Sequence, residues 1–156
     1  MKTDHMSSVT AVFKDLGQAQ KAIQQLIDQA IPAGYISLVA PEHQKLSLQQ
    51  EQYFGIPVQT EKTWQNLFVT GKFADRLENV SSTSFHEALI ALGYSKEEAG
   101  FYSHMLQDAV LMLVVVTDTS IQISRVQDIA RQNEGIIYHR EKDPEEENLP
   151  RPSQML

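Results

Sequence analysis

The chain contains five histidines, the side chains best suited to acid–base or metal chemistry: His5, His43, His86, His104 and His139. No two of them are four residues apart, the spacing that places two imidazoles on one helix face around zinc. Metal sites gather three or more ligands, and the chain has no cysteine to supply them. His86 and His104 would meet Glu97 or Glu98 only if their helices packed antiparallel. We therefore expect no metal and no other cofactor, and histidines on polar helix faces.

A pair of neighbouring carboxylates suggests general acid–base catalysis as a second possibility. Glu97 and Glu98 lie two and three residues after Ser95, the pattern of a capping box that starts a helix. Carboxylates at these positions stabilise the positive end of the helix, so we interpret them as structural. The run from Glu145 to Glu147 is interpreted as a solvated charged segment and not as a cation site.

Motifs for a nucleophile or a nucleotide are missing from the sequence. The serine-rich stretch 81–84 lacks the Gly-x-Ser-x-Gly context of a nucleophile elbow. The seven glycines match neither a P-loop nor a dinucleotide fingerprint. We therefore expect no catalytic residue, and a non-enzymatic protein is the favoured interpretation.

The aromatic side chains are the one feature from which a binding site could be built. Most of them fall between residues 43 and 108: Tyr53, Phe54, Trp64, Phe68, Phe73, Phe85, Tyr94, Phe101 and Tyr102. A cleft beside a sheet, lined by Trp64, Phe68, Phe101 or Tyr102, could hold a small apolar ligand. The same residues could instead form a second hydrophobic core, and the sequence leaves both possibilities open.

The element that must position these residues is the stretch Val110–Thr117, which is apolar until its last residue. Its length and its β-branched content predict a strand. Successive side chains of a strand point to opposite faces, so this strand must be covered on both sides. We therefore predict that it lies at the centre of a sheet.

Two β-α-β units account for the two ends of the chain. The first consists of a strand at Ser8–Phe13, an amphipathic helix at Asp15–Ala30 and a strand at Ile36–Ala40. The second consists of the strand Val110–Thr117, a helix over 120–134 with Gly135 as its C′ residue, and a strand at Ile136–Tyr138. Two such halves predict an α+β domain with a ferredoxin-like, four-stranded antiparallel sheet, in which the first and third strands are central.

A long helical insertion, at about 43–108, separates the two halves. Capping boxes that begin at Ser84 and Ser95 predict two helices, which end near Gly93 and near Gln107. The preceding segments 46–54 and 63–77 have only partial helical spacing. We expect a single domain over residues 1–140, followed by an acidic, proline-rich tail at 141–156.

Several stretches of the chain resemble a known family. They are Val9–Phe13, Gln18–Ile23, Ile36–Ala40, Leu92–Ala99 and the strand Val110–Thr117. In this order they are similar to bacterial heat-induced general stress protein domains. The resemblance implies a ferredoxin-like core and a link to stress conditions, and it carries over no catalytic residue. The middle of such proteins is often rich in glycine and alanine, whereas the middle of this chain is polar and aromatic.

The net charge of the chain makes some classes of binding partner less favourable than others. A formal net charge of -7 argues against nucleic acid and against an anionic membrane, which both attract concentrated positive charge. The longest apolar run is far shorter than the about 20 residues that span a bilayer. Residues Met1–Val9 lack the apolar region of a signal peptide. We therefore expect a cytoplasmic protein.

Three functions stay open on this basis. The favoured one is a stress-associated, non-enzymatic protein that acts through self-association or a protein partner. The second is a small-molecule sensor or binding module with an apolar pocket between the insertion and the sheet. The third and weakest is an enzyme that acts on an apolar substrate bound over the sheet. The helices of the two β-α-β units cover only one face. The inserted helices and a second subunit are available to cover the other, and we expect a homodimer in which the second subunit contributes to this cover.

Overall fold

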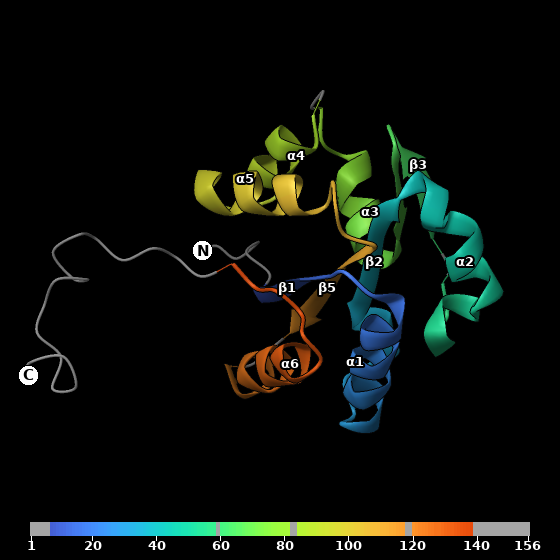
Figure 1. The fold of residues 1–156 in the computed structure, drawn as a ribbon. Helices are drawn as coiled ribbons and strands as arrows, with labels where there is room; N and C mark the ends of the chain where they lie inside the picture. Colours follow the sequence, from blue (N-terminus) through green and yellow to red (C-terminus); the bar gives the residue numbers. More distant parts are fainter. Residues whose placement is uncertain (1–6, 59, 82–83, 118–119, 139–156) are drawn as a thin grey trace, which may run out of the picture.

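The protein is described from a computed structural model, which defines residues 7–58, 60–81, 84–117 and 120–138. The predicted tail at 141–156 lies outside the described residues, as do His5 and His139. The described chain has an α+β architecture, with one antiparallel sheet and helices on both of its faces (Figure 1).

The strands are β1 (Ser7–Phe13), β2 (Ile36–Pro41), β3 (Glu61–Trp64), β4 (Leu67–Thr70) and β5 (Leu111–Thr117). The α-helices are α1 (Leu16–Asp28), α2 (Lys45–Gln50), α3 (Gly71–Glu78), α4 (Phe85–Ala91), α5 (Lys96–Met105) and α6 (Ser120–Gln132). Three short 3-10 segments connect them: η1 (Ala33–Tyr35), η2 (Glu42–Gln44) and η3 (Gln52–Gly55). None of the helices in the described ranges has the length and hydrophobicity of a membrane-spanning segment.

The sheet has the strand order β1-β5-β2-β4-β3, and every neighbouring pair is antiparallel. The prediction that Val110–Thr117 forms an interior strand is confirmed, because β5 pairs with β1 on one side and with β2 on the other. The β1–β5 pairing runs from Ser7 opposite Thr117 to Phe13 opposite Leu111.

The sheet has five strands, so the prediction of four is wrong. The hairpin β3–β4 extends the β2 edge, and all but its first two residues fall in the segment 63–77, where the sequence shows partial helical spacing. Its turn contains Gln65 with a φ of 58°. Phe68 and Val69, adjacent in β4, belong to hydrophobic clusters on opposite faces of the sheet. Because β4 has apolar side chains on both faces, Leu67–Val69 lack the alternation of apolar and polar residues that would have predicted a strand.

The predicted strand Ile136–Tyr138 is reduced to a single bridge at the β1 edge. Val12 donates its N–H to the Ile136 carbonyl oxygen at 2.9 Å, and Ile136 donates its N–H to the Val12 carbonyl oxygen at 2.8 Å. The ladder goes no further, because the Tyr102 hydroxyl lies between the two backbones at the next position, where Thr10 and Tyr138 would pair.

Both faces of the sheet are covered by helices of this one chain. Helices α1 and α6, together with α2 and η3, cover one face, and α3, α4 and α5 cover the other (Figure 1). The central strand β5 gives Leu111, Leu113 and Val115 to the first face and Met112 and Val114 to the second, and none of the five is more than 3% exposed. The insertion thus buries the sheet face for which a second subunit was expected. Neither face of the sheet in the described residues is left exposed for a second subunit to cover. The homodimer therefore stays a prediction.

The predicted helix starts are confirmed by their capping bonds. The side chains of Asp15 and Ser84 each accept a hydrogen bond from the backbone N–H three residues further on, at 3.0 and 3.1 Å. Ser95 and Glu98 form a complete capping box, with bonds of 3.0 and 2.9 Å between each side chain and the other residue's backbone N–H. The second capping box fixes where α5 begins, and so which of its residues face the sheet.

The end of α6 differs from the prediction in one detail. The C′ residue, with the left-handed φ of 68°, is Glu134 and not Gly135. Gly135 follows it and donates its N–H to the Ala130 carbonyl oxygen at 2.7 Å. A Cβ on Gly135 would lie 2.8 Å from both that oxygen and Cζ of Phe13. Glycine is therefore needed here for space, because the chain passes directly over a buried ring of β1.

We predict that Gly135→Ala lowers the free energy of unfolding by about 1–3 kcal/mol, the usual cost of forcing an extra carbon into a packed core. Gly34→Ala is the matched control, since a Cβ there would meet nothing within 4 Å. Urea unfolding of the three proteins tests this. Equal midpoints for Gly135→Ala and the wild type would contradict the close packing of Gly135 on Phe13.

Candidate functional site

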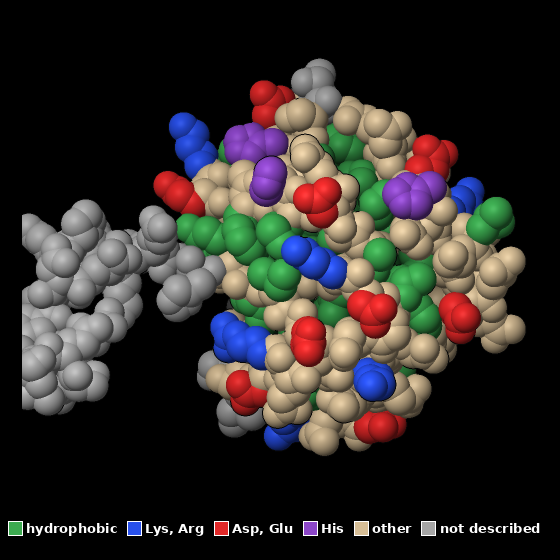
Figure 2. All heavy atoms as spheres, viewed as in Figure 1, with side chains coloured by type: hydrophobic (Ala, Val, Ile, Leu, Met, Phe, Trp, Pro, Cys, Tyr) green, Lys and Arg blue, Asp and Glu red, His purple; other side chains and the backbone are tan. Residues whose placement is uncertain are grey.

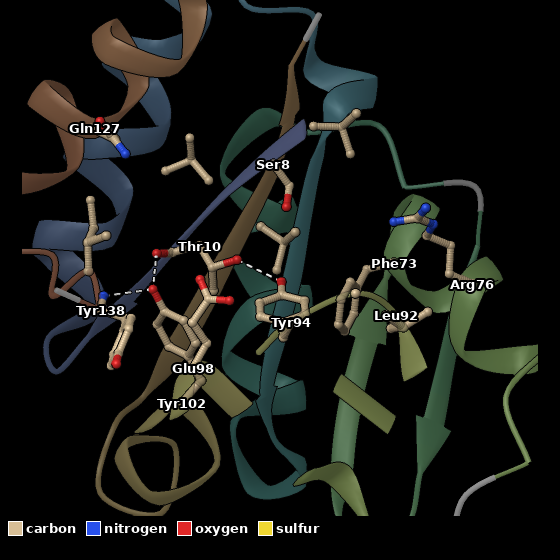
Figure 3. A pocket seen from close by; sticks show the side chains of 15 residues that line it. Ser8, Thr10, Phe73, Arg76, Leu92, Tyr94, Glu98, Tyr102, Gln127 and Tyr138 are labelled. Carbon is tan, nitrogen blue, oxygen red and sulfur yellow. Dashed lines mark hydrogen bonds between the residues drawn. The ribbon is translucent and has the colours of Figure 1, made fainter. Parts of the chain in front are cut away.

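The Tyr102 hydroxyl joins three segments that are far apart in the sequence. It donates to the Thr10 carbonyl oxygen on β1 at 2.8 Å and accepts from the Tyr138 backbone N–H at 2.8 Å (Figure 3). Tyr102 projects from α5 onto the sheet and is 2% exposed. The oxygen therefore fastens the insertion both to the first strand and to the segment that follows α6.

The position of this hydroxyl explains why the last predicted strand stops after one bridge. In an antiparallel ladder the next hydrogen-bonded pair after Val12 and Ile136 would be Thr10 and Tyr138. Instead, the Tyr138 N–H bonds to the Tyr102 hydroxyl, which in turn bonds to the Thr10 carbonyl oxygen. The side chain is inserted into the ladder and holds the two backbones apart.

Tyr94 contacts the same strand from a second direction. Its hydroxyl lies 2.7 Å from Oγ1 of Thr10 (Figure 3). Gly93, with a φ of 110°, is the C′ residue after α4, and the Tyr94 N–H closes the helix on the Leu89 carbonyl oxygen at 3.0 Å. This turn sends the Tyr94 ring back towards the sheet, where it meets the Tyr102 ring edge-on at a centroid distance of 6.1 Å.

A pocket of about 290 Å³ lies beside these contacts, between the insertion and the β1–β5 part of the sheet. We call it the tyrosine pocket. Its polar lining consists of Ser8, Thr10, Arg76, Tyr94, Glu98, Tyr102, Gln127 and Tyr138. Its apolar lining includes Phe73, Leu92, Val114, Val116 and Ile137. The pocket is thus a gap in the second cover of the sheet. Strands β1 and β5 form its floor, and its walls come from α3, α5, the α4–α5 turn, α6 and the segment after α6.

Two opposite charges line the tyrosine pocket. Arg76 belongs to α3 and Glu98 to α5, and in Figure 3 the rings of Tyr94 and Phe73 lie between them. The two groups do not form an ion pair with each other, and the guanidinium has no hydrogen-bond or ion-pair partner among the described residues. The pocket therefore offers a guanidinium at one end and a carboxylate at the other.

Burial raises the pKa of both tyrosines above the usual value for this side chain. For Tyr94 the hydrogen bond with Thr10 opposes the effect of burial, and among the nearby charges Glu98 raises the pKa while Arg76 lowers it. For Tyr102 the hydrogen bond from the Tyr138 N–H opposes the effect of burial. Both hydroxyls are therefore neutral at physiological pH and are able to donate hydrogen bonds.

Two of the four predicted pocket residues, Phe101 and Tyr102, come together in the structure. Tyr102 lines the tyrosine pocket. Phe101 supports the site from outside the lining, since its ring packs on Tyr102 and on Tyr138 at centroid distances of 5.1 and 5.4 Å. Both rings therefore contribute to the place where α5 is fastened to the sheet.

The other two, Trp64 and Phe68, lie on the β3–β4 hairpin and do not line the tyrosine pocket. Trp64 packs against Phe85 at a centroid distance of 6.2 Å. Phe68 is buried on the α1 and α6 face of the sheet, where it stacks with Tyr53 at 6.3 Å. Because the hairpin is the far edge of the sheet, these rings belong to the packing of that edge.

Sequence reasoning did not identify Thr10, Arg76 or Tyr94 as site residues. Two local signals could have found part of the set. Thr10 is a polar residue inside the apolar run Val9–Phe13, and Tyr94 directly follows the glycine that ends α4. No local signal distinguishes Arg76, because its neighbours in the pocket come from distant parts of the chain.

The histidines of the described chain do not gather into a metal site. Figure 2 shows two of them near each other over α4 and α5 and a third well apart. Within residues 7–58, 60–81, 84–117 and 120–138, no three His, Asp or Glu side chains come together as metal ligands would. His86 instead rests on α5, with Nε2 3.8 Å from where a Cβ of Gly100 would stand.

A comparison of the chain with protein-family models, with curated proteins and with solved structures finds no match in any of the three. The resemblance to general stress protein domains therefore stays a prediction. A role for the tyrosine pocket must be argued from the residues of this chain and their geometry.

We predict that Tyr102→Phe lowers the free energy of unfolding by about 1–3 kcal/mol, because the Tyr138 N–H and the Thr10 carbonyl both lose their partner. Tyr53→Phe is the control, since it also removes one tyrosine hydroxyl, but one that bonds to the exposed side chain of Glu61. Its expected effect is below about 0.5 kcal/mol. Equal losses in the two variants, measured by urea unfolding, would contradict a special role for the Tyr102 hydroxyl.

Alkaline pH should weaken the same contact. Since the pKa of Tyr102 is raised in the folded state, its neutral form contributes stability that is complete below about pH 10, the ordinary tyrosine pKa, and is lost as pH rises further. The difference in unfolding free energy between the wild type and Tyr102→Phe is therefore expected to shrink above about pH 10. Urea unfolding across this range measures it, and a difference independent of pH would contradict the buried, neutral hydroxyl.

Proposed function

We propose that the protein binds a small polar molecule in the tyrosine pocket. The observation that carries this proposal is the composition of the pocket: hydroxyl groups, one guanidinium and one carboxylate line a single space of about 290 Å³. Sites for small ligands typically combine apolar walls with a few placed polar groups. Hydrogen bonds at Thr10 hold Tyr94 and Tyr102 in place, so the site is formed before any ligand arrives.

The proposal changes the small-molecule hypothesis in one respect. An apolar ligand between insertion and sheet was expected from the aromatic residues, but the charged and hydroxyl groups of the pocket favour a polar one. A catalytic role has less support. No histidine is among the described lining residues, and one oxygen of Glu98 already caps α5 through a 2.9 Å bond from the Ser95 N–H.

A stress-associated role through self-association or a protein partner stays a second proposal, and its support is the resemblance to general stress protein domains. The large hydrophobic side chains that are exposed in the described chain are Leu46, 69% exposed, and Ile90, 36% exposed. They lie on different helices, α2 and α4, and give no continuous apolar face. A cytoplasmic location belongs to the same proposal.

We also propose that the core of the sheet is ferredoxin-like. The order of the Ile136 bridge, β1, β5 and β2 is what two β-α-β halves of that fold would give, and α1 and α6 pack on the same face. The β3–β4 hairpin is then an addition at the β2 edge. This arrangement supports the family resemblance without assigning an activity.

Binding can be tested by NMR, with a panel of small polar metabolites added to the full-length protein labelled with ¹⁵N. We predict that a binding metabolite shifts the amide signals of Thr10, Tyr94 and Tyr138, which border the pocket. The variant Ser8→Tyr places a large ring at the exposed border of the pocket and should abolish these shifts.

The matched control is Ser124→Tyr, an equally large change at an exposed serine of α6 that does not line the tyrosine pocket. This variant should bind as the wild type does. Metabolites that shift only amides elsewhere, or that bind Ser8→Tyr unchanged, would contradict the proposed site. A panel that shifts no signal would remove the support for a binding function.

A further inference from the structure

We infer that the ligand of the tyrosine pocket is a small zwitterion, a molecule that carries one carboxylate and one ammonium group, as a free amino acid does. This inference rests on the proposed function and narrows it to a class of ligand. It is carried by the placement of Arg76 and Glu98 on different walls of one pocket, whose lining also contains neutral hydroxyl groups.

Arg76 is suited to the carboxylate of such a ligand. A guanidinium presents its N–H donors in a planar fork that matches the two oxygens of a carboxylate. The side chain is half-buried, and among the described residues it has no hydrogen-bond or ion-pair partner. Phe73 lines the pocket from the preceding turn of α3, so the same helix face offers the charge and an apolar wall beside it.

Glu98 is suited to the ammonium group. Its Oε1 accepts the Ser95 N–H at 2.9 Å, which fixes the carboxylate in the pocket wall. The second oxygen has no hydrogen bond to another described residue and can accept one from a ligand. A carboxylate that is already held in place loses little further freedom when it binds.

The pairing of the two charges decides between a zwitterion and a simple ion. A ligand with only a carboxylate would leave Glu98 without a charged partner, and a ligand with only an ammonium group would leave Arg76 without one. A zwitterion satisfies both, and it adds no net charge to a half-buried site. The pocket volume of about 290 Å³ equals the space of about ten water molecules, which suffices for a small amino acid.

Neutral hydroxyl groups in the lining supply hydrogen bonds. The Tyr94 and Thr10 hydroxyls form one hydrogen bond with each other, so the hydroxyl that accepts it keeps its own proton for the ligand. Ser8 adds a third hydroxyl at the border of the pocket. These groups fit the polar surface of an amino acid and leave the apolar wall at Phe73 and Leu92 for its side chain.

Isothermal titration calorimetry of the full-length protein tests the ligand class. The probes are glycine, alanine, β-alanine and γ-aminobutyrate, with propionate and propylamine as ligands that carry only one charge. At least one zwitterion should bind more tightly than propionate and propylamine by about tenfold or more, the effect of one additional charged hydrogen bond. The preferred spacing of the charges follows from which amino acid binds best.

Arg76→Gln and Glu98→Gln should each weaken zwitterion binding by about tenfold or more. In the Glu98→Gln variant the side-chain amide keeps an oxygen that can accept the Ser95 N–H, so the helix cap is preserved and thermal melts can confirm that the variant is folded. The controls Arg125→Gln and Glu97→Gln remove the same charges at exposed positions outside the tyrosine pocket and should leave binding unchanged.

The outcomes separate this inference from the proposed function. If propionate or propylamine binds as well as the best of the four zwitterions, or if Glu98→Gln has no effect, the zwitterion is wrong while a polar ligand in the pocket stands. If another polar metabolite shifts the pocket amides and no amino acid binds, the zwitterion is again wrong and a polar ligand in the pocket stands. If no compound of either panel binds, the proposed function is wrong as well.

Discussion

A strand that is apolar on both faces requires two covers, and this requirement governs the whole structure. Strand β5 sends Leu111, Leu113 and Val115 to one side and Met112 and Val114 to the other, and all five are buried. Burying side chains of this size stabilises a fold by about 1.5–3 kcal/mol each, so neither face can be left in water. Helices α1 and α6 cover one side, and the insertion must therefore cover the other.

Helices α3, α4 and α5, which form the second cover, are held on the sheet by hydrogen bonds that two tyrosines of the insertion make to Thr10. Tyr102 bonds to its carbonyl oxygen, and Tyr94 bonds to its hydroxyl. By accepting the Tyr138 N–H as well, Tyr102 keeps the last segment from completing the ladder at the β1 edge. The tyrosine pocket lies where the backbones are held apart, so the same contact that fixes the cover also shapes the candidate site.

The parts of the fold that local chemistry decides could be predicted from the sequence. The capping box at Ser95 and the apolar composition of β5 each act over a few residues, and both predictions are confirmed. The bridge at Ile136 could not be foreseen, because its length depends on a side chain from α5 that is 34 residues earlier in the sequence (Tyr102 to Ile136). The sequence likewise does not show that Arg76 and Glu98 line the same pocket, because α3 and α5 must first pack beside each other.

The central claim is that the Tyr102 hydroxyl lies between Tyr138 and Thr10, and NMR couplings across hydrogen bonds test it most directly. We expect a coupling from the Val12 nitrogen to the Ile136 carbonyl carbon and another from the Ile136 nitrogen to the Val12 carbonyl carbon, which serve as the internal reference. We expect no such coupling from the Tyr138 nitrogen to the Thr10 carbonyl carbon, together with a slowly exchanging Tyr102 hydroxyl proton close to the Tyr138 amide proton. A direct coupling from the Tyr138 nitrogen to the Thr10 carbonyl carbon would show a completed strand and would contradict the inserted hydroxyl.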